Sequence, residues 1–305
     1  MKKILLLIFY LSPIYCIGQY NPGKGLALYE DSLIKLESRI YKSIPDSSKL
    51  LLNTKFISLF ERALKTDKSF DYPFDSLKSI ARLASSDHRF KILNWNLPLS
   101  DGTFIYYGFI QSYNYKTKKY ELFPLIDKSD DIKNLATIST DNLKWFGMLY
   151  YKIIEQKYKK KTYYTLLGWE GNDKISCKKI IDVISFNNTG IPKFGEALFE
   201  MGKQNPKRVI FEHSSSAIMS LRYDDQNELI VFDHLAPLSP AFEGQYQYYA
   251  PDLSYDGFEF KKGKWVYIKN VDARNGKSDK DKTYTQPGTK EKKEAKRFYN
   301  SSGKH

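Results

Sequence analysis

The spacing of hydrophobic residues divides the chain into a helical front and a strand-rich body. Between Leu26 and Ile40, apolar residues recur every three or four positions, the period of one helix face. Pro45 ends this predicted helix, and a second helix follows with its N-cap at Asp46 or Ser47.

The same spacing continues, more weakly, after the second helix. A third, shorter helix is expected to begin near Asp75 and to bury Leu77, Ile80 and Leu83. Short links favour antiparallel packing of consecutive helices, so residues 19–88 are predicted to form one small helical element.

From Phe90 onward, runs rich in Tyr, Phe, Ile and Val alternate with short polar turns such as Asp101-Gly102. Short links join antiparallel neighbours, whereas parallel strands need long crossovers. The fold class is therefore predicted as α+β, with a mostly antiparallel β-body over residues 89–275 that forms a sandwich or a curled sheet. Strands are expected at 90–95, 103–113, 119–125, 145–157, 162–170, 175–186, 207–213, 217–223, 228–235, 255–261 and 264–270, with Trp95, Trp145, Trp169 and Trp265 in their core.

One turn fixes a predicted register. A four-residue loop over 224–227 places Asp233 opposite Ile218 and His234 opposite Ala217 on the paired strand. No serine then lies opposite either histidine of the body. Between 129 and 135, Asp130 begins a segment that is expected to add a helical turn.

The first eighteen residues have the anatomy of a secretory signal. Lys2 and Lys3 precede a short apolar run, and the small residues Cys16 and Gly18 favour cleavage before Gln19. A lipoprotein interpretation would instead acylate Cys16. No later run reaches the ~18 apolar residues of a membrane span. The mature chain is therefore expected to be exported: periplasmic, outer-surface or secreted.

Charge is concentrated at the C-terminus. The formal net charge of the whole chain is +13, and residues 274–305 hold ten Lys or Arg against four acids. Residues 276–305 have almost no aliphatic side chains, so a disordered basic tail is predicted, suited to peripheral attachment at anionic surfaces or to no partner at all. Nucleic acid is not expected as a partner because the chain leaves the cytoplasm.

Candidate general acid–base chemistry consists of two neighbouring pairs, Glu212-His213 and Asp233-His234. Adjacent residues of a strand point to opposite faces of its sheet, so neither pair can enter one site directly. A hydrolase of periplasmic or surface material would need pairing across strands, and no nucleophile-elbow motif is present. Cys177 lies in a predicted strand and is interpreted as a small core residue rather than a nucleophile.

Metal and cofactor signals are weak. Asp252, Asp256 and Glu259 provide oxygen donors that would suit Ca²⁺, but their spacing departs from an EF-hand loop and favours turn formation. Zinc-hydrolase motifs and phosphate-binding glycine loops are absent from the sequence, so no cofactor is expected.

Aromatic recognition is the third candidate. The connection 236–254 is long in a chain of tight turns, and such loops often meet ligands. Its tyrosines could stack on a glycan or anchor an envelope protein, or could simply cover the end of the sheet. The predicted ligand-binding residues are Tyr246, Tyr248, Tyr249 and Tyr255.

Three strings in the body resemble an uncharacterised family of secreted Bacteroidetes proteins: 163–173, 207–237 and 250–265. The resemblance covers roughly residues 100–275 and implies export, but no activity. The function expected is therefore a non-enzymatic binding or cell-envelope-associated protein, with the hydrolase as the alternative and a structural module attached by its basic tail as a third.

Overall fold

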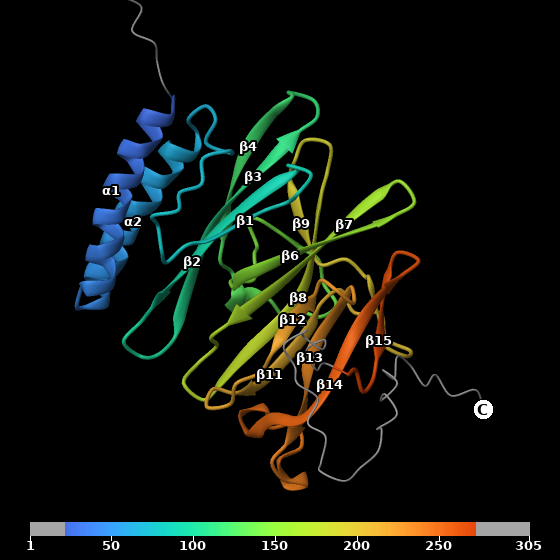
Figure 1. The fold of residues 1–305 in the computed structure, drawn as a ribbon. Helices are drawn as coiled ribbons and strands as arrows, with labels where there is room; N and C mark the ends of the chain where they lie inside the picture. Colours follow the sequence, from blue (N-terminus) through green and yellow to red (C-terminus); the bar gives the residue numbers. More distant parts are fainter. Residues whose placement is uncertain (1–21, 273–305) are drawn as a thin grey trace, which may run out of the picture.

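The computed structural model describes residues 22–272, which form an α+β fold of one helical layer and three packed β-sheets (Figure 1). The predicted fold class is confirmed. The helices are α1 (Pro22–Lys42) and α2 (Asp46–Leu64), with short 3-10 turns η1 (Ser129–Asp131), η2 (Pro240–Phe242) and η3 (Tyr246–Tyr248).

The strands of the described residues belong to three sheets whose neighbours are antiparallel except for β10 and β15. The first sheet, in order, is β1 (Ala81–Ala84), β2 (Phe90–Pro98), β3 (Phe104–Asn114) and β4 (Lys119–Ile126). The second is β5 (Thr140–Asp141), β9 (Pro192–Phe194), β8 (Ser176–Phe186), β7 (Lys161–Glu170) and β6 (Leu149–Tyr158), with β11 (Val209–Ser214) paired to β8. The third is β10 (Phe199–Glu200), β15 (Lys264–Ile268), β14 (Tyr249–Lys261), β13 (Leu229–Pro237) and β12 (Leu221–Asp224).

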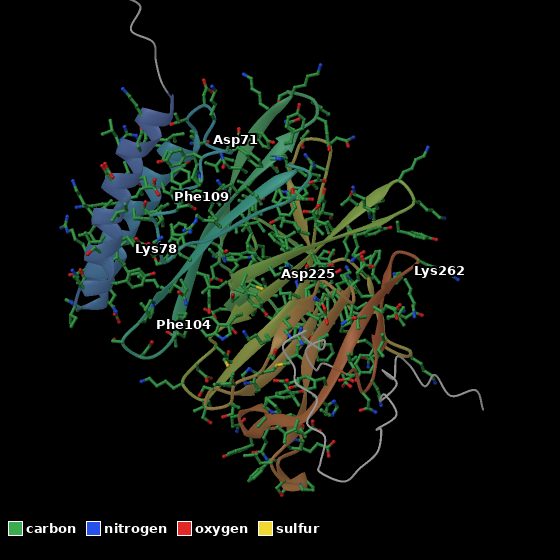
Figure 2. All side chains as sticks on the ribbon, in the orientation of Figure 1. Asp71, Lys78, Phe104, Phe109, Asp225 and Lys262 are labelled. Carbon is green, nitrogen blue, oxygen red and sulfur yellow. The ribbon has the colours of Figure 1, made fainter. Side chains whose placement is uncertain are left out.

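The helices and the first sheet share one hydrophobic core. Trp95 and Phe109 of that sheet pack among the aromatic side chains of α2, and Phe109 lies between the helical layer and the sheet (Figure 2). The Trp95 indole N–H donates to Asn53 Oδ1 at 3.0 Å, so the buried polar atoms are paired. The predicted boundary near residue 88 therefore does not separate two cores.

Alternation along the strands builds the remaining two cores. In β2, Leu93 and Trp95 face the helices, whereas Phe90 and Ile92 face the second sheet. In β8, Ile180 likewise contributes to the core between the first and second sheets, and its neighbours face the third sheet. Strands buried on both faces lose the simple apolar–polar alternation, which explains their continuous hydrophobic runs.

The predicted third helix is wrong: the segment after α2 forms turns and then strand β1. Its backbone amides are taken by carboxylates of α1. Ser76 N–H donates to Glu30 Oε1 and Ser79 N–H donates to Glu37 Oε1, both at 2.8 Å. Each amide that binds a carboxylate is unavailable for a helical hydrogen bond, and Leu77 is buried in the first core without a helix.

The predicted register of β12 and β13 is also wrong, by two residues. Asp224 pairs with Leu229, so the connecting loop is 225–228 and Asp233 lies opposite Ser220. Asp224 Oδ1 accepts the amides of the two loop residues that follow Asp225, which favours this closure. A shift of two residues leaves every side chain on its expected face.

One buried ion pair joins β8 to the segment entering β11. Arg208 Nε lies 2.9 Å from Asp182 Oδ2, and both side chains are essentially inaccessible. The Nε–H bond is not directed at that oxygen, so this contact is electrostatic rather than a hydrogen bond. The guanidinium donates its other N–H groups to the carbonyls of Leu135 and Ile138 and to Thr140 Oγ1.

Several predictions concern residues outside the described part of the chain, namely the signal at 1–18 and the basic tail at 276–305. Within residues 22–272, neither helix is long and apolar enough to cross a membrane. The predicted helical turn near Asp130 is present as η1.

Replacing Asp182 with Ala should destabilise the fold strongly, because it leaves the Arg208 guanidinium buried without a counter-charge. We expect urea denaturation to show a loss of about 3–5 kcal/mol in the free energy of unfolding. The exposed pair Lys152–Asp225 is the matched control, and Asp225→Ala should cost under about 1 kcal/mol. Equal losses in the two variants would contradict this assignment.

Candidate functional site

The candidate site lies where β8 and β11 pair. Their register places His213 directly opposite Cys177, in the same ladder that sets Val209 opposite Ile181. Directly opposite residues of antiparallel strands point to the same face and bring their side chains into contact. Two side chains separated by 35 intervening residues thus become neighbours through sheet register alone.

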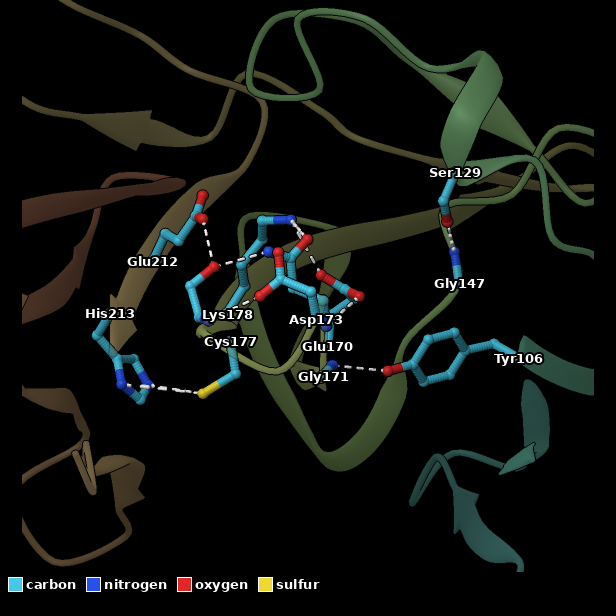
Figure 3. A network of polar contacts seen from close by, with 12 residues as sticks. Tyr106, Ser129, Gly147, Glu170, Gly171, Asp173, Cys177, Lys178, Glu212 and His213 are labelled. Atoms are coloured by element: carbon cyan, nitrogen blue, oxygen red, sulfur yellow. Dashed lines mark hydrogen bonds and ion pairs between the residues drawn. The ribbon is translucent and has the colours of Figure 1, made fainter. Parts of the chain in front are cut away.

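The thiol and the imidazole face each other in this pair (Figure 3). Cys177 Sγ lies 3.5 Å from His213 Nε2 and 3.9 Å from Nδ1, while Nδ1 lies 2.9 Å from the carbonyl oxygen of Ser214. A carbonyl oxygen can only accept, so this hydrogen bond assigns the ring proton to Nδ1. The lone pair of Nε2 is then directed at the thiol.

Burial keeps both groups neutral. Removal from water raises the pKa of the Cys177 thiol, although a hydrogen bond from Trp169 and the charge of Lys179 act in the opposite direction. Removal from water lowers the pKa of His213, opposed mainly by its hydrogen bond to Ser214. Around pH 7 the site holds a thiol and an unprotonated imidazole rather than an ion pair.

The pair lines an open pocket of about 440 Å³. Residues of the loop 215–219 after β11 line it, together with Gly102 and Gly171. The wall carries apolar and basic side chains together, namely Phe104, Trp169, Lys174, Lys179, Ile218 and Met219.

Cys177 is therefore not the core residue that the sequence indicates. It is partly exposed, belongs to none of the three cores of the described residues, and contacts a pocket. Trp169, also expected in the core, is partly exposed and lines the same pocket, whereas Trp95, Trp145 and Trp265 are buried as predicted. Trp145 is buried outside any strand, since β6 begins only at Leu149.

Glu212 faces away from this pocket, as alternation along a strand requires. Its carboxylate accepts from Ser176 Oγ at 2.7 Å, on the face where Lys178 contacts Glu170 at 3.1 Å (Figure 3). The two neighbours in sequence, Glu212 and His213, thus enter different environments.

His234 has an acidic partner, but it is not its neighbour Asp233. His234 Nδ1 lies 2.7 Å from Asp256 Oδ2 on β14, and the same carboxylate accepts from the Tyr267 hydroxyl and from the Asn270 amide. Asp233 accepts the Ser220 amide instead. The sequence could not indicate Asp256 as the partner because the pairing depends on an irregular register between β13 and β14.

The three carboxylates proposed as calcium ligands do not converge. Asp252 accepts the amide and hydroxyl of Ser254, Asp256 is buried beside His234, and Glu259 contacts Lys261 at 2.7 Å. Within residues 22–272, no group of three or more His, Cys, Asp or Glu side chains is placed to hold a metal ion.

The tyrosines of the 236–254 connection lie on an extension of the β13–β14 hairpin. Tyr246, Tyr248 and Tyr255 are exposed, and Tyr249 is half-buried with its hydroxyl accepting the Gly244 amide. The turn η3 at the tip of this hairpin lies against β11, so the aromatic segment borders the strand that carries His213.

Comparisons with known proteins provide no further guide to this site. No protein-family model matches the chain, and neither a curated protein nor a solved structure matches it.

The geometry predicts how His213 titrates. Its NMR titration midpoint should lie below the ordinary value of 6.5, with Nδ1 carrying the proton in the neutral form. The pKa of His213 is lower in the folded protein than in the unfolded chain. Between these two pKa values the unfolded state binds more protons, so His213 should reduce the free energy of unfolding as the pH falls from 6.5 toward the folded-state pKa. A midpoint above 6.5, or a neutral form protonated on Nε2, would contradict the assignment.

Proposed function

We propose that this chain is an exported, envelope-associated protein that binds another protein through the extended β13–β14 hairpin. One observation carries the proposal: the hairpin holds large apolar side chains outside all three cores. Leu253 is 91% exposed and Leu238 is 71% exposed, and Tyr246 of the same hairpin is also exposed. Large apolar side chains that one hairpin exposes to solvent are typical of interaction sites.

The conformation of the bulge in β14 supports this proposal. Asp233 pairs with Tyr255 but Leu235 pairs with Pro251, so the three residues 252–254 of β14 stand opposite the single residue His234 of β13. Leu253 occupies this bulge at φ +72°, a region that a leucine rarely adopts. Bulges re-aim side chains, and a strained backbone that presents an apolar residue to solvent suggests a selected surface.

A protein partner fits this surface better than a glycan. Sugars stack on flat aromatic rings, whereas exposed leucines provide no such face and instead fill apolar pockets of a partner protein. The signal expected at residues 1–18 and the resemblance to secreted proteins support export.

The alternative hydrolase was expected to use His213 or His234 with nearby carboxylates. His213 does not share a face with Glu212, and the carboxylate bound to His234 is Asp256. The side chain that His213 does contact is the thiol of Cys177, rather than a carboxylate.

Substitutions at the hairpin should weaken partner binding without unfolding the protein. A photocrosslinking residue in place of Tyr246 should capture a partner in envelopes of the native host, and the purified pair should then be titrated by calorimetry. We expect Leu253→Asn and Tyr248→Ala each to raise the Kd at least about tenfold. Asn tolerates a positive φ, so the first change relieves strain.

Leu143→Ser is the matched control, because this leucine is also exposed (63%) but lies in the loop between β5 and β6. Its Kd should equal that of the unmodified protein. Binding of glycans alone, or equal Kd values in hairpin and control variants, would overturn the proposal.

A further inference from the structure

The pocket at Cys177 holds a thiol and an imidazole, two reactive groups that play no part in binding through the hairpin. Covalent catalysis needs a nucleophilic atom, a base that takes its proton, and a third group that orients the base. Here Sγ meets Nε2 at 3.5 Å, and the Ser214 carbonyl holds the ring in the tautomer that presents Nε2 as an acceptor. All three groups lie at one end of the β8–β11 ladder, on rigid strands.

We infer that Cys177 and His213 form a nucleophile–base pair that hydrolyses carboxylic esters or thioesters with an anionic group on the acyl chain. His213 Nε2 takes the thiol proton as Sγ attacks the carbonyl carbon. The leaving alcohol or thiol departs with that proton, and Cys177 becomes a thioester. Water, deprotonated by the same Nε2, then releases the carboxylic acid and restores the thiol.

The pocket wall supports each part of this chemistry. The side chain of Trp169 and the positive charge of Lys179 both act to lower the pKa of the Cys177 thiol, which favours the thiolate as it forms. General-base catalysis requires no resting thiolate, only an unprotonated imidazole in reach of the thiol. Both requirements are met by His213.

The lining also indicates the class of substrate. Phe104, Ile218 and Met219 provide apolar surface for an acyl chain, and Lys174 and Lys179 provide positive charge for an anionic group. The acid of the same lining, Asp173, has its Oδ1 bound to two backbone amides of the β7–β8 turn. An apolar chain that ends in a carboxylate or another anion matches this arrangement.

The test uses the full chain carrying Cys16→Ser, so that Cys177 is the only thiol. The probe is mono-p-nitrophenyl suberate, and p-nitrophenyl octanoate is its neutral counterpart of equal length. We expect a burst of nitrophenolate close to one per chain, an acyl adduct located at Cys177 by mass spectrometry, and about a fivefold rate preference for the anionic probe.

Variants separate the roles of the residues. Cys177→Ala should abolish the adduct, and His213→Gln should slow acylation by about 100-fold or more. Lys174→Gln with Lys179→Gln should bring the rates of the two probes together. His88→Asn is the matched histidine control, since Asn accepts the positive φ of position 88, and it should acylate at the unmodified rate.

A pH profile of the Cys16→Ser protein keeps the proposal falsifiable if the His213 variant does not fold. With His213 as base, the acylation rate should rise through a midpoint below 6.5 and then stay level. A simple thiolate reaction would instead keep rising toward the thiol pKa, which burial raises above 9.0. The charges that act on the pKa of His213 are Lys179 on β8, which lowers it, and Asp233 on β13 and Glu212 on the opposite face of β11, which raise it.

Three results would overturn the proposal: no adduct at Cys177, unchanged acylation in His213→Gln, or a rate that keeps rising with pH. Equal rates with the two probes would overturn the anionic substrate class. Leu253→Asn should acylate normally, so failure of the hairpin proposal and failure of this one are distinguishable.

Discussion

The pairing of β11 with β8 depends on one buried ion pair, and the candidate site depends on that pairing. Arg208 and Asp182 occupy the same register that sets His213 opposite Cys177, five residues along each strand. An odd number of residues places the ion pair on the opposite face of the sheet from the thiol and imidazole. If β11 slipped by one residue along β8, the Arg208 guanidinium would lose its carboxylate. His213 would then turn to the opposite face of the second sheet, toward the core between the first and second sheets.

Long-range polar contacts also decide the local structure near the helices. Glu30 and Glu37 lie outside the apolar stripe of α1, where charged residues are normally solvated, yet both are buried against the segment that follows α2. Their carboxylates satisfy backbone amides of that segment and replace the hydrogen bonds of a helix. Helix periodicity in Leu77 and Ile80 therefore reflects burial alone.

The two candidate surfaces share an edge of the molecule, because η3 of the hairpin lies against β11. A protein bound to the hairpin would therefore stand close to the strand that carries His213. Binding and thiol chemistry are compatible in one protein, since the exposed residue Leu253 is absent from the lining of the pocket at Cys177.

The order and type of most elements follow from the sequence, because α1 and α2 carry a sustained period of 3.6 and the long strands carry apolar runs rich in β-branched and aromatic residues between turn residues. The faces of Glu212 and His213 were likewise predictable from strand alternation. The exposure of Tyr246 and Tyr248 was not, because tyrosines of a long connection can equally cover the end of a sheet. Tertiary structure alone decided the partners: Cys177 for His213, Asp256 for His234, and the glutamates of α1 for the segment after α2. Such contacts arise from strand register and from carboxylates reaching distant amides, and local periodicity contains no information about either.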